Sequence, residues 1–176
     1  MVDVIAKAQM GDVIWAQLDP DADLYDEIIE ICRREDIRSG VVLNIVGGLR
    51  KARLSLPIEA ASFEAQPGIL ELEGMMEAQG IGTIGFTVDT YDSSAKSGIV
   101  YHAGEPNLHI HITITHEGKS YMGHLLQGCI VRSLHPRSHF TIVLAKTPGA
   151  LLKFRVSDEK NSTYPDGMPI HDLVQE

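Results

Sequence analysis

The chain has 176 residues, 44% of them hydrophobic, which suits one compact domain with a full-sized core. Its 15 Lys and Arg residues against 24 Asp and Glu give a net charge of -9, which disfavours nucleic-acid binding without excluding it. Two cysteines are too few for a disulfide framework, and no apolar stretch approaches the length of a membrane span. With no signal pattern in the first ten residues, we expect a cytoplasmic protein that does not enter the membrane.

The N-terminal part predicts one strand and one amphipathic helix. Residues 11–18 (GDVIWAQL) have strand character and end at a Pro-containing turn. Residues 21–23 (DAD) offer helix N-caps, and a helix that runs to about Asp36 follows, with acidic residues in its first turn. Its apolar residues recur at helical spacing: Leu24, Ile28, Ile31 and Cys32. Cys32 is therefore expected in the core and not as a nucleophile.

The next segment is rich in β-branched residues and glycine. Residues 39–46 (SGVVLNIV) form a nearly continuous apolar run, which predicts a strand buried on both faces. Gly47-Gly48 predicts a bulge, a bend or a close backbone approach before an alternating strand over residues 49–56. That second strand contains the densest basic patch of the chain, Arg50-Lys51-Arg53, which is more typical of a solvated strand face than of a nucleic-acid site.

The middle of the chain predicts two further strands between loops. Residues 57–67 have loop character, and residues 69–79 and 80–88 each have strand character, the latter despite its glycines. Residues 89–106 are rich in turn formers and predict a loop that could act as a lid, because long loops in compact domains are often functional.

The chemistry of the chain is concentrated in residues 107–127, NLHIHITITHEGKSYMGHLLQ. Apolar residues alternate with His or Thr from Leu108 to Thr115, which indicates a strand with two chemically different faces. A two-residue turn at Glu117-Gly118 would place residue 116 opposite residue 119 and His124 opposite His111. A three-residue turn would instead send His124 to the apolar face.

His109, His111 and His124 converge in the first of these registers, because opposed residues of one face have Cβ atoms about 5 Å apart. Three neutral imidazoles can hold a divalent ion of the zinc type and leave a fourth position open, as in catalytic sites. The alternative is that the His-x-His pair belongs to an exposed polar face without a ligand.

The rest of the chain predicts a final antiparallel pair, residues 129–134 and 139–144, and an irregular C-terminal extension. That extension, residues 147–176, is broken by prolines and is expected to pack on the domain of residues 11–146 or on a neighbouring subunit. The predicted fold is α+β, with a largely antiparallel sheet and one main N-terminal helix. One helix cannot cover such a sheet and its edges, so we expect a homo-oligomer.

Four blocks in this order resemble the plant and prokaryote conserved (PPC) domain in its prokaryotic stand-alone form. They are GVVLNIVGGLRKARL, GILELEGMM, EPNLHIHITI and GHLLQGCIV, spread over roughly residues 11–145. The resemblance implies a homotrimer of α+β subunits in which His109, His111 and His124 match the three-histidine metal position of the family, usually taken as zinc. Plant relatives that couple this domain to an AT-hook gave the family its DNA-binding label, but no Arg-Gly-Arg-Pro hook is present here. The acetolactate decarboxylase family is similar in presenting an HxH pair and a later His to zinc.

Three functions remain open at this point. The first is a metal-dependent enzyme, of lyase or hydrolase type, or a sensor, for a small oxyacid or carbonyl compound. In it Glu105 is the candidate acid/base, and Arg50 or Arg53 is the candidate partner of a substrate carboxylate. The second is a DNA-binding or transcription-associated protein without an AT-hook, and the third is a structural trimer without metal.

Overall fold

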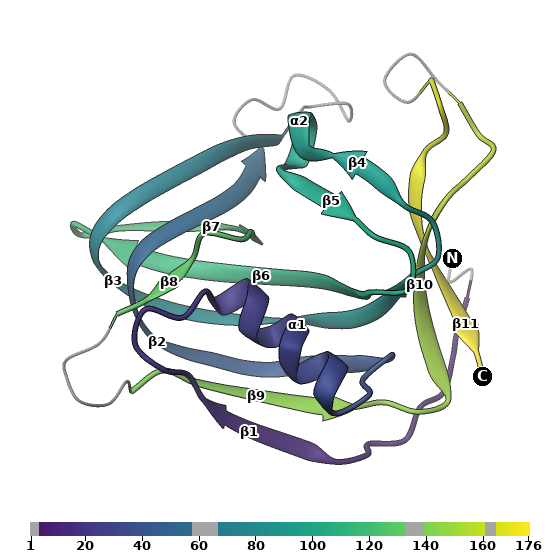
Figure 1. Cartoon of the computed structure of the whole chain (residues 1–176), viewed down its shortest axis with the longest axis horizontal. Helices are drawn as coiled ribbons and strands as arrows, with labels where there is room; N and C mark the ends of the chain where they lie inside the picture. The colour runs from purple at the N-terminus through teal and green to yellow at the C-terminus, as the bar shows by residue number, and fades with distance from the viewer. Residues whose placement is uncertain (1–3, 58–66, 133–138, 161–164) are drawn as a thin grey trace.

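The structure is a computed structural model that describes residues 4–57, 67–132, 139–160 and 165–176 (Figure 1). It confirms the α+β class, with a largely antiparallel sheet and one main helix near the N-terminus. The elements in chain order are β1 (Val13–Gln17), α1 (Leu24–Arg34), β2 (Gly40–Pro57), β3 (Pro67–Thr87), β4 (Tyr91–Ser93), α2 (Ser94–Ser97), β5 (Ile99–Tyr101), β6 (Pro106–His116), β7 (Lys119–Leu125), β8 (Ile130–Val131), β9 (Thr141–Lys146), β10 (Ala150–Val156) and β11 (Pro169–Gln175). Neither helix of the described residues has the length and apolar character that crossing a membrane requires.

Helix α1 follows the predicted pattern closely. The Asp23 side chain is its N-cap and accepts hydrogen bonds from the backbone N–H groups of Tyr25 and Asp26. Acidic residues occupy the first turn and basic residues the last, the arrangement that the helix dipole favours. The face toward the sheet is apolar and buried, and it includes all four residues that the helical spacing selected: Leu24, Ile28, Ile31 and Cys32.

Strands β2 and β3 are long, curved, and paired with each other along most of their length (Figure 1). Each had been predicted as two shorter strands, and that expectation is wrong. Gly47 passes through the middle of β2 with φ 151°, and a Cβ built there would lie 2.6 Å from the Phe140 ring. The glycine pair thus permits a close backbone approach within one continuous strand. The Phe140 ring occupies the space that a side chain at position 47 would need.

Four strands close into a ring, since β2 pairs with β3, β3 with β6, β6 with β7, and β7 with β2. Strands β8 and β9 lie farther along the same edge of β2 as β7, and β1 pairs with β9. The predicted direct pairing of the last two strands is therefore wrong for the described residues, because both pair with β2. Residues 57–67 and 133–138, predicted to be loop and turn, lie almost entirely outside the described residues.

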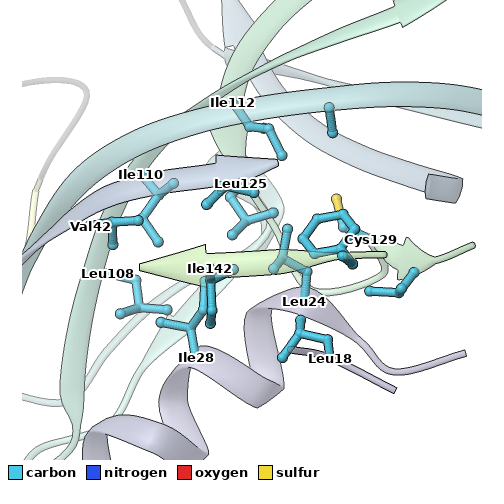
Figure 2. Packing of buried hydrophobic residues seen from close by; sticks show 14 of the residues in the cluster. Leu18, Leu24, Ile28, Val42, Leu108, Ile110, Ile112, Leu125, Cys129 and Ile142 are labelled. Atoms are coloured by element: carbon cyan, nitrogen blue, oxygen red, sulfur yellow. The ribbon is translucent and has the colours of Figure 1, made fainter. Parts of the chain in front are cut away.

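The core lies between α1 and the inner face of the sheet (Figure 2). Leu24 and Ile28 of α1 meet Leu108 and Ile110 of β6 there, together with Ile142 of β9. The apolar residues of β6 are all buried, whereas the alternate positions of the strand point to the opposite face. The period-two pattern of this strand therefore fixes which side of the sheet faces the helix.

The face of β2 turned away from the core is left exposed by the part of the chain that the structure describes. Leu43 is 42% exposed and Val46 is 47% exposed, so the predicted burial of β2 on both faces is wrong for a single subunit. Ile81 of β3 and Met122 of β7 are also exposed, on strands that pair with β2, and so is Trp15 of β1, which pairs with β9. The β-branched run had predicted a covered strand, but α1 covers only one face.

The C-terminal extension is not irregular, contrary to expectation. Strands β10 and β11 form an antiparallel hairpin, and β10 joins the end of β3 in parallel through Lys153 and Phe154. Pro169 is the first residue of β11, a position where the missing N–H of proline costs no hydrogen bond of the strand interior. Alternating apolar residues within both segments had more influence on the structure than the prolines between them.

Shortening Ile110 to Ala should lower the free energy of unfolding by about 2–5 kcal/mol, because the side chain is 2% exposed in the packed core. Urea unfolding of the two proteins measures the difference. Ile5→Ala removes the same atoms from a side chain that is 76% exposed and should change stability by less than about 0.5 kcal/mol. Equal losses in the two variants would contradict the placement of the core.

Candidate metal centre

The β6–β7 hairpin has the register that the sequence predicted. His116 pairs with Lys119 across the turn, and His111 pairs with His124. Glu117 and Gly118 both have positive φ, 50° and 74°, as a type I′ turn requires. The two-residue turn therefore places all three histidines on the face of the hairpin opposite the core.

The three side chains form a compact group. His109, His111 and His124 each offer a ring nitrogen, and these atoms all lie within 4.8 Å of one another. The ring centroids of His109 and His111 are 5.3 Å apart, those of His109 and His124 4.9 Å, and those of His111 and His124 4.6 Å. The backbones of His109 and His111 are also fixed from the other side, because they pair with Thr83 and Ile81 of β3.

This donor set fits a divalent ion of the zinc type. Zinc–nitrogen bonds of about 2.0–2.1 Å in a tetrahedral arrangement separate the ligand nitrogens by roughly 3.4 Å. The observed upper limit of 4.8 Å is close enough for side-chain rotations to reach that spacing without a change of backbone. Three imidazoles leave one tetrahedral position for water or another ligand, as in catalytic sites.

The electrostatics of His109 and His124 favour neutral rings, the form in which imidazole binds metal. Desolvation lowers the pKa of His124 to about 4, and the neighbouring charges of His109, His111 and His171 act in the same direction. Desolvation also lowers the pKa of His109, followed by the effect of His111. Protons therefore compete weakly for these two nitrogens near neutral pH.

Residues 5–135 match the sequence model of the Plants and Prokaryotes Conserved (PCC) domain. The chain belongs to that family. The resemblance to the PPC domain is thereby confirmed, since the two names denote the same conserved domain. No curated protein matches the chain in sequence.

Solved structures share the fold of this PCC domain over almost its whole length. A metal-containing protein from Archaeoglobus fulgidus is 15% identical with a TM-score of 0.69, and the match covers 96% of this chain and 99% of that one. A plant- and prokaryote-conserved protein from Pyrococcus horikoshii is 19% identical with a TM-score of 0.64 and 97% coverage of both chains. A protein from Bacteroides thetaiotaomicron with a provisional DNA-binding name is 15% identical with a TM-score of 0.60, at 95% and 96% coverage.

Glu105 does not join the histidines. Its carboxylate lies 2.7 Å from a guanidinium nitrogen of Arg33 on α1, and it lines a cleft of about 570 Å³ between α1 and residues 98–106. The predicted irregular lid is instead the short unit β4–α2–β5, and residues 98–102 face α1 across this cleft. Helix α1 packs on the inner face of β6, whereas the histidines lie on the outer face, so the cleft and the metal centre are separate.

Arg50 is also held elsewhere. Its guanidinium lies 2.7 Å from the Asp21 carboxylate. Arg50 precedes Ser55, the partner of His124 on β2, by five positions, which is about 17 Å along an extended strand. The structure thus brings the three predicted metal ligands together and separates both predicted catalytic residues from them.

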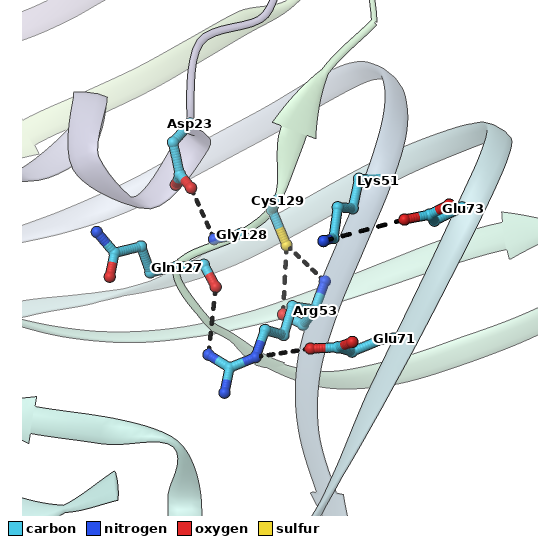
Figure 3. Close-up of polar contacts among 8 residues, drawn as sticks. All are labelled: Asp23, Lys51, Arg53, Glu71, Glu73, Gln127, Gly128 and Cys129. Atoms are coloured by element: carbon cyan, nitrogen blue, oxygen red, sulfur yellow. Dashed lines mark hydrogen bonds and ion pairs between the residues drawn. The ribbon is translucent and has the colours of Figure 1, made fainter.

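The rest of the basic patch is neutralised by acidic residues of β3 (Figure 3). Lys51 lies 4.0 Å from Glu73, and the guanidinium of Arg53 lies 3.2 Å from Glu71. The backbone N–H and C=O of Arg53 bond the Cys129 thiol, whose pKa burial raises to about 11. The patch is therefore part of a charge-paired sheet surface, and Cys129 is a structural residue.

One histidine near the candidate metal centre was not among the predicted site residues. His171 of β11 has its ring centroid 5.4 Å from that of His109, with the two planes inclined by 27°. The sequence contained little signal for it, because it lies in a segment interrupted by prolines and 47 positions after His124. The pairing of β10 with β3 brings β11 to this side of the sheet.

In the metal-free protein, the free energy of unfolding should decrease as the pH falls from 6.5 toward 4. The unfolded chain protonates His124 near its ordinary pKa of 6.5, whereas the folded chain does so only near pH 4. The unfolded state therefore binds more protons throughout this window. Urea unfolding at several pH values should show a shallower dependence in His124→Gln than in the wild type. The same slope in both proteins would contradict the lowered pKa.

Proposed function

We propose that this PCC domain binds a divalent metal ion, zinc or a zinc-like ion, through His109, His111 and His124. The observation that carries the proposal is the convergence of three ring nitrogens within 4.8 Å on a rigid β-hairpin. The lowered pKa values of His109 and His124 support it, because they keep these rings in the ligand form. The name of the Archaeoglobus relative, a metal-containing protein, agrees with it.

The open fourth position suggests action on, or sensing of, a small oxyacid or carbonyl compound. A bound zinc-type ion would supply Lewis acidity toward a carbonyl or carboxylate oxygen, or toward water. The histidines hold and orient the ion, and the strands behind them keep their backbones fixed. Glu105 and Arg50 receive no catalytic role in this proposal, since ion pairs with Arg33 and Asp21 hold them.

The DNA-binding alternative has weaker support. It rests on the provisional names of relatives such as the Bacteroides protein. In this chain, Arg50, Lys51 and Arg53 all face carboxylates, and the net charge is -9. A phosphate backbone would have to displace those acidic partners while approaching a negative protein, which makes strong DNA binding unfavourable.

We also propose that copies of the chain associate, as a homotrimer, through the uncovered face of the sheet. Trp15, Leu43, Val46, Ile81 and Met122 are exposed on that face. Several large apolar side chains exposed on one face of a sheet are typical of an interface. Oligomerisation would cover Leu43 and Val46, which explains why β2 carries apolar residues on both faces.

Replacing His111 with Ala should reduce the bound metal from one ion per subunit to near zero, because two imidazoles cannot hold the ion as three do. Elemental analysis of protein purified without a His tag gives the ratio of metal to subunit. His116→Ala is the matched control, since His116 lies on the same strand but contacts the Met75 carbonyl outside the cluster. An unchanged ratio in His111→Ala, or a metal-free wild type, would reject the metal site.

Trp15→Glu should shift the protein from a trimer toward single chains of 19.3 kDa, because a carboxylate would replace a 72% exposed apolar ring on the proposed interface. Size-exclusion chromatography with light scattering measures the mass. Val100→Glu adds the same charge on β5, away from that face, and should leave the mass unchanged. A wild type of single-chain mass would refute the trimer.

A further inference from the structure

His171 contacts the metal centre from a part of the chain beyond the matched PCC residues. It belongs to β11 (Pro169–Gln175), whereas the family model ends at residue 135. Its ring stacks against that of His109 at 5.4 Å. The C-terminal hairpin thus adds a fourth imidazole beside the three candidate ligands.

The His171 ring is itself anchored. Its Nε2 lies 3.1 Å from the Asn107 side-chain oxygen, which can only accept, so this hydrogen bond requires the tautomer in which Nε2 carries the proton and donates. Asn107 is 3% exposed, whereas His171 is exposed, so the bond between them is partly buried and its acceptor is shielded from water. The Phe154 ring packs edge-on against His171 at 5.6 Å, with a plane angle of 62°. A hydrogen bond and an aromatic contact therefore fix the ring that touches His109.

His171 is close to the cluster without being part of the ligand set. The nitrogens that lie within 4.8 Å of one another belong to His109, His111 and His124 alone among the described residues. The hydrogen bond to Asn107 occupies Nε2 of His171. His171 therefore contacts the candidate ligand His109 and does not itself bind the proposed ion.

Within the described residues, the three candidate ligands lack the hydrogen-bonded support that metal-binding histidines usually have. Such residues commonly donate their second ring nitrogen to a carboxylate or carbonyl, which fixes the ring. Among the side-chain hydrogen bonds of the described residues, none involves His109, His111 or His124, whereas His116 and His171 each make one. For His109, the anchored ring of His171 is the neighbour that can take over this function.

We propose that His171 is a positioning residue of the metal centre. Stacked on His109 and tied to Asn107, it holds the His109 ring so that its nitrogen faces those of His111 and His124. This inference rests on the proposed metal site. It implies that the C-terminal hairpin, which the family model does not include, is needed for full metal affinity.

The test is a double-mutant cycle on metal affinity. His171→Ala removes the stacked ring, and Asn107→Leu removes only its anchor; each should weaken Co²⁺ binding about tenfold or more, as outer partners of metal ligands do. The double variant should be no weaker than His171→Ala, because the two residues act through one contact. Competition titration gives the affinities, and the visible Co²⁺ spectrum reports any change in ligand geometry.

Two further variants separate positioning from loss of fold. Asn107→Asp keeps an acceptor for His171 and should bind Co²⁺ more tightly than Asn107→Leu does, whereas His116→Ala, outside the cluster, should retain wild-type affinity. Circular dichroism confirms that each variant is folded, and the Nε2–H form of His171 can be read from nitrogen NMR of the metal-free wild type. The absence of that form would overturn the proposal even if His171→Ala did not fold.

The outcomes also distinguish this inference from the proposed function. Wild-type affinity in His171→Ala, with metal lost in His111→Ala, would overturn the positioning role and leave the metal site intact. Loss of metal in His171→Ala as complete as in His111→Ala would make His171 a direct ligand, which also overturns it. A wild type that binds no Co²⁺ would remove both proposals.

Discussion

The two-residue turn at Glu117-Gly118 is the constraint on which the candidate site depends. Both residues have positive φ, and this turn sets the register in which His111 pairs with His124. A slip of one residue would move His124 to the core face of β7, because successive side chains of a strand point to opposite sides. The same register keeps Leu108 and Ile110 in the core, so hydrophobic burial stabilises the arrangement that gathers the imidazoles. Folding and site assembly therefore favour a single pairing.

The parts of the molecule that the sequence predicted are those determined by local signals. Periodicity and capping residues defined α1, and the turn residues with the period-two pattern defined the β6–β7 hairpin and its three histidines. Each of these features depends on residues close together in the chain. The stability of these elements depends on local backbone preferences and on which of their faces is apolar.

The parts that could not be predicted depend on contacts between distant segments. Gly47 indicated a close backbone approach, but Phe140, the residue that approaches it, lies far along the chain. The segment that forms β2 was therefore predicted as two strands. The prolines of the C-terminal extension concealed a hairpin whose position depends on β3. His171 reaches His109 only through that hairpin. Glu105 was selected because it is near His109 in sequence, but α1, from a different part of the fold, supplies its partner Arg33.

The sheet divides the molecule into two chemically distinct sides. On the inner side, α1 buries the core and, with residues 98–106, borders a cleft rich in carboxylates. On the outer side, the histidines share the surface with exposed apolar residues, since Ile81 pairs with His111 and Met122 lies two positions before His124. Association through the outer side would reduce the access of water to the histidines, and desolvation is already the main cause of the low pKa of His124. The proposed association and the proposed metal binding should therefore support each other, because burial keeps the rings of His109 and His124 neutral and neutral rings bind the ion.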